Sequence, residues 1–422
     1  MTQDYSTEHK LTIIVVPTER CNLFCQYCFE PEDQKAKGAG FIYDFDAIKK
    51  SLLEVWKGPY HGSDVCLHGG ECTMIPIAEL EKLCSLIFNL PWSGGKVKGS
   101  VSMVTNATLI TDDHIKLFKK YNVHPGVSCD GPPELNVLRG PDPSNSATTA
   151  AYNAVVNANI RKMRGAGVPV SVMCIVHSRN AATREQRAAL GGWMLGLKKL
   201  GVGGGRVNPV TSDSHPEFEL TQDQLFQMWV DVYGWNKQYG MQWNPVVEME
   251  RNLTGENRNP APCINARCDV FSTHTLSILP DGTIGNCDRT FGMGMNARCS
   301  GGGSCGRYEA LAQTECKGCP WWSLCGGGCP LEAVGGDWRR KTRWCGATKK
   351  MYDYIDKEIT KRGIPRITPP ELNAKPQPTQ LVENSPHGDE PHGDDTHGDI
   401  PHGDDPHGDS NHGDTPDWRV KA

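Results

Sequence analysis

The stretch KLTIIVVPTERCNLFCQYC, residues 10–28, decides the fold. Its first eight residues are rich in β-branched side chains, which is typical of a strand buried in a sheet. This strand runs directly into Cys21, Cys25 and Cys28, so the three cysteines are expected on the loop that follows it. Three thiolates suit either a zinc ion or a four-iron cluster, and on a cluster they leave one iron open to a small molecule.

Strand and helix patterns alternate after this stretch, up to about residue 245. Strands are predicted over residues 10–17, 64–68, 101–104, 125–128, 168–176 and 205–210. Helical apolar spacing follows each of them, over residues 45–56, 77–90, 112–121, 151–166, 184–200 and 222–239. Six such alternations predict a parallel α/β sheet or barrel. Polar residues come just after the strands, where a parallel barrel places its active site.

The composition changes from about residue 260, where apolar periodicity fades while cysteine and glycine become frequent. The chain has 18 cysteines, and many of them are grouped. Grouped cysteines in a reducing compartment are more often metal ligands than disulfides. Such dense sets of thiolates suit iron–sulfur clusters or zinc, and histidine does not occur at the spacing of a zinc finger.

The first cysteine group resembles the motif of the radical S-adenosylmethionine (SAM) enzymes, including an aromatic residue, Tyr27, before the last cysteine. In that family the open iron binds the amino and carboxylate groups of SAM. Electron transfer then cleaves SAM to a 5′-deoxyadenosyl radical, which abstracts hydrogen from a substrate. The resemblance therefore implies that Cys21, Cys25 and Cys28 bind a [4Fe–4S] cluster.

Three further segments resemble the family at the ends of later strands. Gly69-Gly70-Glu71 is similar to the GGE segment, which contacts the SAM amino group, although Cys72 stands where the family has proline. Thr105-Asn106 resembles the TNG segment, with alanine in place of glycine, and residues 128–131 (SCDG) resemble the S-x-D-G segment near the ribose and carboxylate. A glutamate or aspartate at such places, taken singly, would be interpreted as a helix cap or turn residue. The implied SAM contacts are Tyr27, Gly69, Gly70, Glu71, Thr105, Asn106, Ser128 and Asp130.

The second cysteine group resembles the SPASM domain, an extension of radical SAM enzymes that modify peptides and proteins. That resemblance implies two auxiliary [4Fe–4S] clusters, and a structural zinc site is the alternative. The first cluster would be bound by Cys263, Cys268, Cys287 and Cys329, and the second by Cys316, Cys319, Cys325 and Cys345. Asp288 stands where the anaerobic sulfatase-maturating enzymes have a base that acts on the substrate. A solvent-facing turn residue explains Asp288 equally well. Cys299 and Cys305, which flank a glycine-rich loop, are given no role.

The last forty residues, 383–422, carry eleven acidic and two basic side chains, a net charge of −9. His-Gly-Asp recurs there every five residues, starting at His387, His392, His397, His402, His407 and His412. The segment has one aromatic residue and few aliphatic ones, so we expect it to be disordered.

Three interpretations of this tail remain open. It is a solvated acidic appendage, a weak metal-binding segment, or a fused substrate that resembles a repeated precursor peptide. Fusion would raise the effective concentration of a substrate toward the millimolar range. Because the repeat lacks cysteine, only chemistry at C–H bonds of His, Gly or Asp is available: a crosslink, an oxidation or an epimerisation.

The expected architecture is a partial (β/α)6 barrel in residues 1–245, a SPASM domain in 246–362, a Pro-rich linker in 363–382 and a disordered tail in 383–422. The expected function is a radical SAM maturase of a ribosomally made peptide, with SAM and three [4Fe–4S] clusters as cofactors. An anaerobic sulfatase-maturating enzyme is the alternative, and a metal-storage or scaffold protein is the alternative of another class. The expected partners are the peptide, in trans or as the tail, and a reductant such as flavodoxin or ferredoxin.

The whole chain has 44 basic and 49 acidic side chains, and a net charge of −5. No basic excess is large enough for binding governed by nucleic-acid phosphates. The sequence contains no apolar run of about 18 residues, so no membrane span is expected. Residues 1–10 lack the profile of a signal peptide, and we expect a cytoplasmic protein.

Overall fold

A single parallel sheet frames the protein in the computed structural model, which describes residues 11–29, 44–57, 63–90, 101–142, 144–210, 215–256, 275–285, 287, 289 and 307–366. The strand order is β7-β6-β5-β4-β3-β2-β1-β8-β9. All neighbouring pairs from β7 through to β8 are parallel, and β9 is antiparallel to β8. The strands are β1 (Leu11–Thr18), β2 (Ser63–Gly69), β3 (Val101–Thr105), β4 (Val123–Ser128), β5 (Ser171–Val176), β6 (Gly204–Pro209), β7 (Gln242–Asn244), β8 (Thr275–Ile278) and β9 (Ile284–Gly285).

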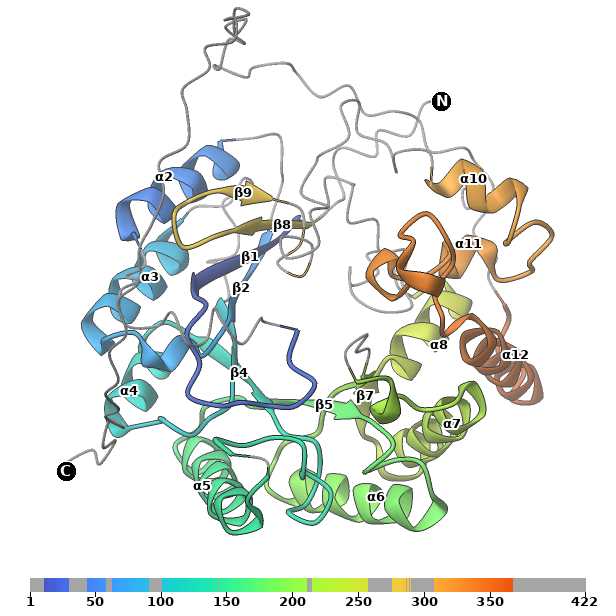
Figure 1. The fold of residues 1–422 in the computed structure, drawn as a ribbon, viewed down its shortest axis with the longest axis horizontal. Coiled ribbons are helices and arrows are strands. Elements are labelled where there is room, and N and C mark those ends of the chain that lie inside the picture. Colours follow the sequence, from blue (N-terminus) through green and yellow to red (C-terminus); the bar gives the residue numbers. More distant parts are fainter. Residues whose placement is uncertain are drawn as a thin grey trace, which may run out of the picture. The chain divides into compact units, whose positions relative to one another are not determined.

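Helices surround the outer side of this curved sheet (Figure 1). The helices that follow β1 to β6 are α2 (Phe45–Trp56), α3 (Ile77–Asn89), α4 (Asp112–Lys120), α5 (Ser146–Gly165), α6 (Arg184–Lys199) and α7 (Gln222–Tyr239), and α8 (Val246–Thr254) follows β7. The remaining helices are α10 (Arg307–Gln313), α11 (Trp322–Cys325) and α12 (Cys345–Lys361). The six expected strand–helix alternations and the parallel α/β sheet are therefore confirmed. No helix in the described part of the chain is long and apolar enough to cross a membrane.

The helix starts are set by polar caps. Thr111, Thr183 and Thr221 each close a capping box at the start of α4, α6 and α7. The Asn145 side chain accepts hydrogen bonds from the first amides of α5, which explains why this helix begins at Ser146 rather than at the predicted residue 151. Local side chains thus decide where the outer layer meets the loops of the sheet's carboxyl edge.

The core lies between the sheet and the outer helices. Ile13 and Leu67 on the strands, and Leu52 and Leu83 on the helices, are completely buried. Cys84 and Cys174 are likewise buried in this core, as their apolar surroundings in the sequence predict, whereas Cys66 is half-buried. The sheet is therefore a rigid support for its carboxyl edge.

The cysteine-rich region is joined to the barrel helices through α12. This helix packs against α7 and α8. The Gln222 side chain at the start of α7 accepts a hydrogen bond from the Ala347 amide at 2.8 Å, and Arg343 forms an ion pair with Glu219 at 2.7 Å. Strands β8 and β9 lie in sequence beyond residue 245, yet they extend the sheet beside β1. The polypeptide after the barrel thus returns to the strand that leads into the first cysteine group.

Candidate active site at the carboxyl edge of the sheet

The loop after β1 carries Cys21, Cys25 and Cys28, and all three thiols are half-buried. This loop is fastened across the carboxyl edge by backbone hydrogen bonds to the segment after β4. Phe24 N donates to Gly140 O at 2.9 Å, and residue 26 donates to residue 138 at 3.0 Å. The dark blue loop in Figure 1 follows this path. The main chain of the cysteine loop is therefore fixed at the carboxyl edge.

The Cys21 thiol lies in an environment that keeps it protonated without a metal. Burial, together with the charges of Cys25, Glu71 and Cys28, raises its pKa to about 12. The Asn106 side-chain amide approaches the Cys21 sulfur at 3.9 Å, and hydrogen bonds of this kind tune the potential of a bound cluster. Binding of a metal cluster here must displace the thiol protons.

No group of three His, Cys, Asp or Glu side chains in the described residues gathers closely enough to hold a single metal ion. A four-iron cluster makes a different demand, because each thiolate binds a different iron. The three thiols on one fixed loop, with an amide donor beside one of them, fit such a group.

Glu71 joins the ends of β2 and β3. Its side chain is 1% exposed, and its Oε1 accepts hydrogen bonds from Thr73 N at 3.1 Å, Thr73 Oγ1 at 2.5 Å and Thr105 Oγ1 at 2.7 Å. Its Oε2 accepts one from Asn106 N at 2.6 Å. The cap expected of a lone glutamate is therefore present, since Glu71 begins the short helix at residues 72–74, but the carboxylate also fixes two of the predicted SAM-site residues.

Asp130 holds the end of β4 against β5 and the cysteine loop. The carboxylate is completely buried and accepts a hydrogen bond from Ile175 N at 2.9 Å. Tyr27, next to Cys28, donates its hydroxyl proton to the same carboxylate. Burial raises the pKa of the Asp130 carboxyl, while the nearby Arg139 charge and the Tyr27 hydrogen bond oppose that rise. Two of the predicted SAM-site residues are therefore in direct contact.

The second cysteine group forms a pocket of its own. Four cysteines line it together: Cys316, Cys319, Cys325 and Cys345. Burial, together with the charges of the other three cysteines, raises the pKa of the Cys325 thiol to about 12. These are the four residues expected to bind one auxiliary cluster, and they come from α11, α12 and the turns before them.

The other auxiliary set is only partly described. Cys287 is half-buried and Cys329 is 7% exposed, whereas Cys263, Cys268 and Asp288 lie outside the described residues, as do Cys299 and Cys305. Arg289 lies with its guanidinium 5.6 Å from the ring centre of Phe29, the residue after Cys28. The Cys287 segment therefore reaches the loop of the first cysteine group.

Residues 15–190 match the model of the Radical SAM superfamily. This range includes the first cysteine group, Glu71, Asn106 and Asp130. The chain contains a radical SAM domain. The family implies a [4Fe–4S] cluster and SAM as cofactors.

Curated proteins that are similar to this chain include anaerobic sulfatase-maturating enzymes. The serine-type anaerobic sulfatase-maturating enzyme of Klebsiella aerogenes is 23% identical over 369 residues, 79% of this chain and 82% of that enzyme. The cysteine-type enzyme of Clostridium novyi is 21% identical over 351 residues, 76% of this chain and 87% of that enzyme. An uncharacterized Synechocystis protein is 32% identical over 132 residues, but the match spans only 31% of its length. The chain is thus related in sequence to the anaerobic sulfatase-maturating enzymes.

Solved structures share its fold. The structure described as native anSMEcpe with bound AdoMet and Cp18Cys peptide aligns with a TM-score of 0.65 and 18% identity, over 84% of this chain and 98% of that one. Streptococcus suis SuiB bound to S-adenosylmethionine aligns with a TM-score of 0.52 and 14% identity, over 80% of this chain and 77% of that one.

The ends of strands β2 to β4 bring the remaining predicted SAM-site residues of the radical SAM domain to this edge. Ser128 ends β4 and Thr105 ends β3, and both are buried. A Cβ atom added at Gly69 would lie 2.7 Å from Thr18 O, and one at Gly70 would lie 2.1 Å from Arg20 O. The two glycines therefore let the end of β2 approach the cysteine loop.

Two residues that belong to this edge were missed in the sequence. Arg139 donates from Nη1 to the Tyr27 hydroxyl at 2.7 Å and lies 4.0 Å from Asp130. His177, directly after β5, is completely buried, and its ring centre is 6.0 Å from that of Tyr27. Its Nδ1 accepts a hydrogen bond from Arg179 N, so the proton of the neutral ring is on Nε2. The position of His177 just after a strand was the available signal.

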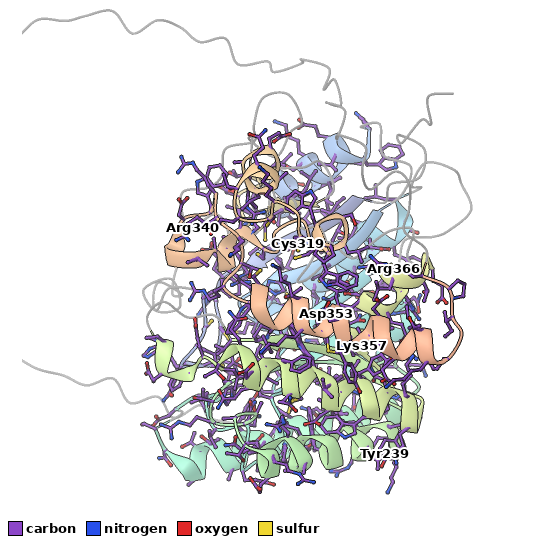
Figure 2. The ribbon with its side chains drawn as sticks, turned by 90° about the vertical axis from the view of Figure 1, so that its right-hand side faces the viewer. Tyr239, Cys319, Arg340, Asp353, Lys357 and Arg366 are labelled. Atoms are coloured by element: carbon purple, nitrogen blue, oxygen red, sulfur yellow. The ribbon has the colours of Figure 1, made fainter. Side chains whose placement is uncertain are left out.

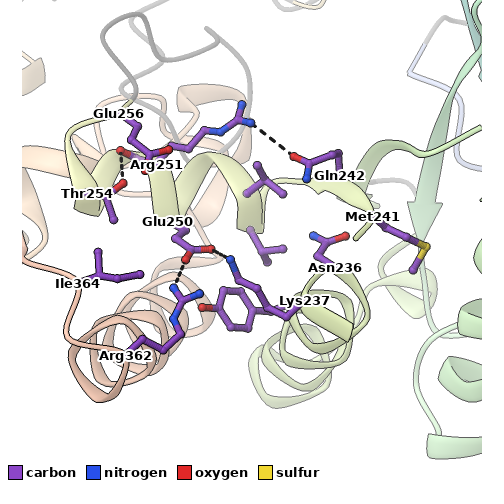
Figure 3. Close-up of a pocket in the computed structure, with 13 residues that line it drawn as sticks. Asn236, Lys237, Met241, Gln242, Glu250, Arg251, Thr254, Glu256, Arg362 and Ile364 are labelled. Atoms are coloured by element: carbon purple, nitrogen blue, oxygen red, sulfur yellow. Dashed lines mark hydrogen bonds and ion pairs between the residues drawn. The ribbon is translucent and has the colours of Figure 1, made fainter. Parts of the chain in front are cut away.

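Another cavity of the described residues lies away from this edge, at the amino end of β7 (Figure 3). It is bounded by α7, α8 and the end of α12, and the Glu250 carboxylate accepts hydrogen bonds from Lys237 and Arg362 inside it. No predicted site residue lines this cavity. This cavity is therefore separate from the predicted site at the carboxyl edge, where a parallel barrel places its chemistry.

Proposed function

We propose that the chain uses SAM and a reduced [4Fe–4S] cluster to abstract hydrogen from a C–H bond of a ribosomally made peptide. Cys21, Cys25 and Cys28 would hold the cluster, which supplies the electron for cleavage of SAM to a 5′-deoxyadenosyl radical. The protein's own contribution is to orient the reactants and to exclude competing reactions. The observation that carries the proposal is the hydrogen-bonded network that joins this cysteine loop to Glu71 and Asp130 at the carboxyl edge.

The residues of this edge have distinct proposed tasks toward SAM. Glu71 Oε2 accepts a hydrogen bond from Asn106 N, and the carboxylate retains capacity for an ammonium donor such as the SAM amino group. Its Oε1 is fully used in fixing Thr73 and Thr105. Tyr27, Gly69, Gly70, Asn106, Ser128 and Asp130 complete the proposed SAM site.

We further propose that the cysteine-rich region, residues 246–362, is a SPASM domain with two auxiliary clusters, preceded by the barrel in 1–245 and followed by the linker and tail. The shared pocket of Cys316, Cys319, Cys325 and Cys345 supports one ligand set. Cys263, Cys268, Cys287 and Cys329 form the other proposed set. The two auxiliary clusters would accept the electron that the substrate radical loses when it is oxidised.

Asp288 is proposed as the base that removes the accompanying proton from the substrate. Support comes from its neighbour Arg289, whose guanidinium lies against Phe29 in the cysteine loop. A carboxylate beside a cluster ligand is suited to accept a proton as an electron leaves the same substrate.

The proposed substrate is a peptide, as in the anSMEcpe structure with its bound peptide. The His-Gly-Asp repeats of the chain itself are the first candidate, because repeated units are typical of precursor peptides and tethering favours intramolecular recognition. A crosslink, an oxidation or an epimerisation at His, Gly or Asp is the proposed outcome.

Anaerobic reconstitution with iron and sulfide tests these proposals. We expect about twelve irons per chain, four for each of three clusters, and 5′-deoxyadenosine on addition of SAM and dithionite. Mass spectrometry and chiral amino-acid analysis of the tail, before and after turnover, then test the substrate. Formation of 5′-deoxyadenosine with an unchanged mass and stereochemistry of the tail would exclude the tail as substrate.

The second candidate function is maturation of a sulfatase. It is favoured by the similarity over 82% of the Klebsiella enzyme and 87% of the Clostridium enzyme, and by the Cys287-Asp288 pair. A sulfatase-derived peptide with a serine or cysteine target tests it, because formylglycine carries an aldehyde that a hydrazide reagent captures. Capture from this peptide, with no change in the tail, would decide for the second function.

A further inference from the structure

A basic surface surrounds the pocket of Cys316, Cys319, Cys325 and Cys345. Residues 315–350 contain seven basic and three acidic side chains. Figure 2 shows Cys319 and Arg340 on the face that α12 crosses. The basic surface consists of Lys317, Arg339, Arg340, Lys341, Lys349 and Lys350.

Acidic neighbours balance only part of this charge. Glu315 pairs with Arg340 at 3.0 Å, and Asp337 lies 3.6 Å from Arg339. Lys317 and Lys349 are exposed and form no ion pair with another described residue. The Lys350 ammonium pairs with Asp223. The uncompensated positive charge that this surface presents to solvent therefore includes Lys317 and Lys349.

The thiol pocket itself is open to this surface. Cys319 and Cys345 are half-buried, whereas Cys316 is 8% exposed. Lys349 is both exposed and part of the pocket lining. A molecule bound to the basic surface is consequently close to the atoms that would hold the cluster.

We propose that the basic surface docks an acidic protein that carries single electrons and exchanges them with the cluster bound by these four cysteines. The inference rests on the proposed auxiliary cluster. No covalent bond forms or breaks: the cluster, reduced by one electron from the substrate radical, returns to its oxidised state as the oxidised carrier gains that electron. Complexes of electron-transfer proteins are weak and bury little surface. Charge complementarity raises their association rate more than their affinity.

A second role for the same charge is to neutralise the cluster, which bears about two negative charges with four thiolates. That role concerns the charges nearest the thiols, such as Lys349 in the lining. Lys317 and Arg339 lie outside the pocket lining, and Arg339 is 68% exposed. Substitution of Lys317 and Arg339 therefore tests docking without removing the charge that lines the pocket.

The test uses the reconstituted full chain, reduced and freed of dithionite, with oxidised flavodoxin as the acidic probe. Stopped-flow absorbance follows flavin reduction at low and high salt. Docking predicts that Lys317→Glu/Arg339→Glu lowers the second-order rate constant about 10-fold at low salt, and that wild type and variant converge at high salt, where screening is strong. Interferometry of the two oxidised proteins should show the same loss of binding.

The matched control is Lys119→Glu/Arg161→Glu, which makes the same change of charge on exposed residues of α4 and α5. Its rate constant should stay within about two-fold of wild type. Equal effects of both variants, or a rate that does not depend on salt, would overturn the docking surface. A neutral quinone as acceptor completes the test, since an equal slowing with quinone and flavodoxin would assign the charge to the cluster instead.

Two further measurements distinguish failure of the proposed auxiliary cluster from failure of the docking inference. If Cys319→Ala leaves the iron content unchanged, the pocket holds no cluster and the proposed function fails at this point. If the iron content and dithionite-driven 5′-deoxyadenosine formation are normal in Lys317→Glu/Arg339→Glu and the flavodoxin rate is also unchanged, only the docking inference fails.

Discussion

Two buried carboxylates determine the arrangement of the proposed SAM site. Glu71 ties the end of β2 to the end of β3 through Thr105 and Asn106, and Asp130 ties the end of β4 to β5 and to Tyr27. A buried carboxylate is tolerated only when hydrogen bonds or opposite charges satisfy it. The acids that the family motif marks are therefore also structural members of the edge.

Replacement of Glu71 by glutamine keeps the shape of the side chain but removes its charge, so it tests the hydrogen-bond network. In Glu71→Gln an amide NH2 group must face donors such as Thr105 Oγ1 or Asn106 N. We expect a loss of about 2–4 kcal/mol in the free energy of unfolding, because a charged hydrogen-bond acceptor is lost and a buried donor is left unpaired. Anaerobic urea unfolding measures this loss, and calorimetry should show weakened SAM binding.

The control for this substitution is Glu54→Gln on the exposed side of α2. It makes the same chemical change without a buried partner, so the urea midpoint should not move. An unchanged midpoint in Glu71→Gln would contradict the account of the Glu71 network.

Sequence motifs identified the cysteines, Glu71 and Asp130 because each stands next to a recognisable strand end. They did not identify Arg139 or His177. Arg139 meets Tyr27 across 112 positions of the chain, and its burial depends on the path of the cysteine loop. No local pattern encodes such a contact, so only the folded structure shows it.

His177 predicts a pH dependence of stability. Burial and the charges of Arg139 and Arg179 lower its pKa from 6.5 to about 3 in the folded protein. Between about pH 7 and pH 5.5 the unfolded chain takes up a proton that the buried ring does not, so stability is lost as the pH falls. The expected loss from this residue is about 1 kcal/mol over that range.

Urea unfolding of His177→Asn at the two pH values measures this contribution. The asparagine keeps an acceptor for Arg179 N but has no group that titrates in this range. Its stability should fall less than that of wild type, whereas His124→Asn, at an exposed position, should behave as wild type. An identical pH dependence in wild type and His177→Asn would contradict the prediction.

At the scale of elements, the end of β2 and the loop after β1 depend on each other. Gly70 N donates to Thr18 O at 2.9 Å and Glu71 N to Arg20 O at 2.7 Å. A methyl group at residue 70 would overlap the backbone of Arg20. The glycine is therefore required by the approach of two main chains, whatever its contact with SAM.

Gly70→Ala is consequently expected to displace the cysteine loop. We expect a loss of about 3 kcal/mol in stability, since the overlap is with backbone that cannot move aside. Iron analysis after reconstitution should show about four fewer irons per chain, with the auxiliary clusters retained.

Gly196→Ala is the matched substitution. Gly196 lies inside α6, and nothing is within 4 Å of an added Cβ atom. Alanine there should stabilise the helix by about 0.5–1 kcal/mol and leave the iron content unchanged. Retention of the full iron content in Gly70→Ala would show that the loop accommodates the methyl group.

The elements themselves were predicted unevenly. Strands β1 to β6 and the helices after them follow from apolar periodicity, and they lie close to their predicted bounds. Strands β7, β8 and β9 have three, four and two residues, too few to show a period. Their place in the sheet depends on pairing with β6 and β1, which are distant in sequence.

At the scale of the molecule, loss of a cysteine from each of the two groups should have a different effect on SAM cleavage and iron content. Cys25→Ala removes a ligand of the proposed SAM-binding cluster, so 5′-deoxyadenosine formation should fall at least about 100-fold. Cys345→Ala removes a ligand from the pocket at the start of α12 and should lower iron content by about four atoms while SAM cleavage persists. Product analysis should then show SAM cleavage uncoupled from peptide modification. Loss of SAM cleavage in both variants, with normal circular dichroism, would contradict separate roles.

The charge of the whole molecule bears on how a substrate tail is recognised. Residues 1–382 carry about four more basic than acidic side chains, but three clusters with their thiolates add about five negative charges. With its clusters bound, this part of the chain is near neutrality and has little general attraction for a tail with a net charge of −9. Recognition must therefore come from specific contacts to the His-Gly-Asp units.

Truncation after residue 382 tests whether specific contacts select the tail. The truncated enzyme should still cleave SAM, and a synthetic two-repeat peptide should restore product only near millimolar concentration, the range that tethering supplies. A peptide with the same composition in scrambled order is the control. Equal modification of the scrambled peptide would show that charge alone selects the substrate, and modification of neither would remove the tail from the reaction.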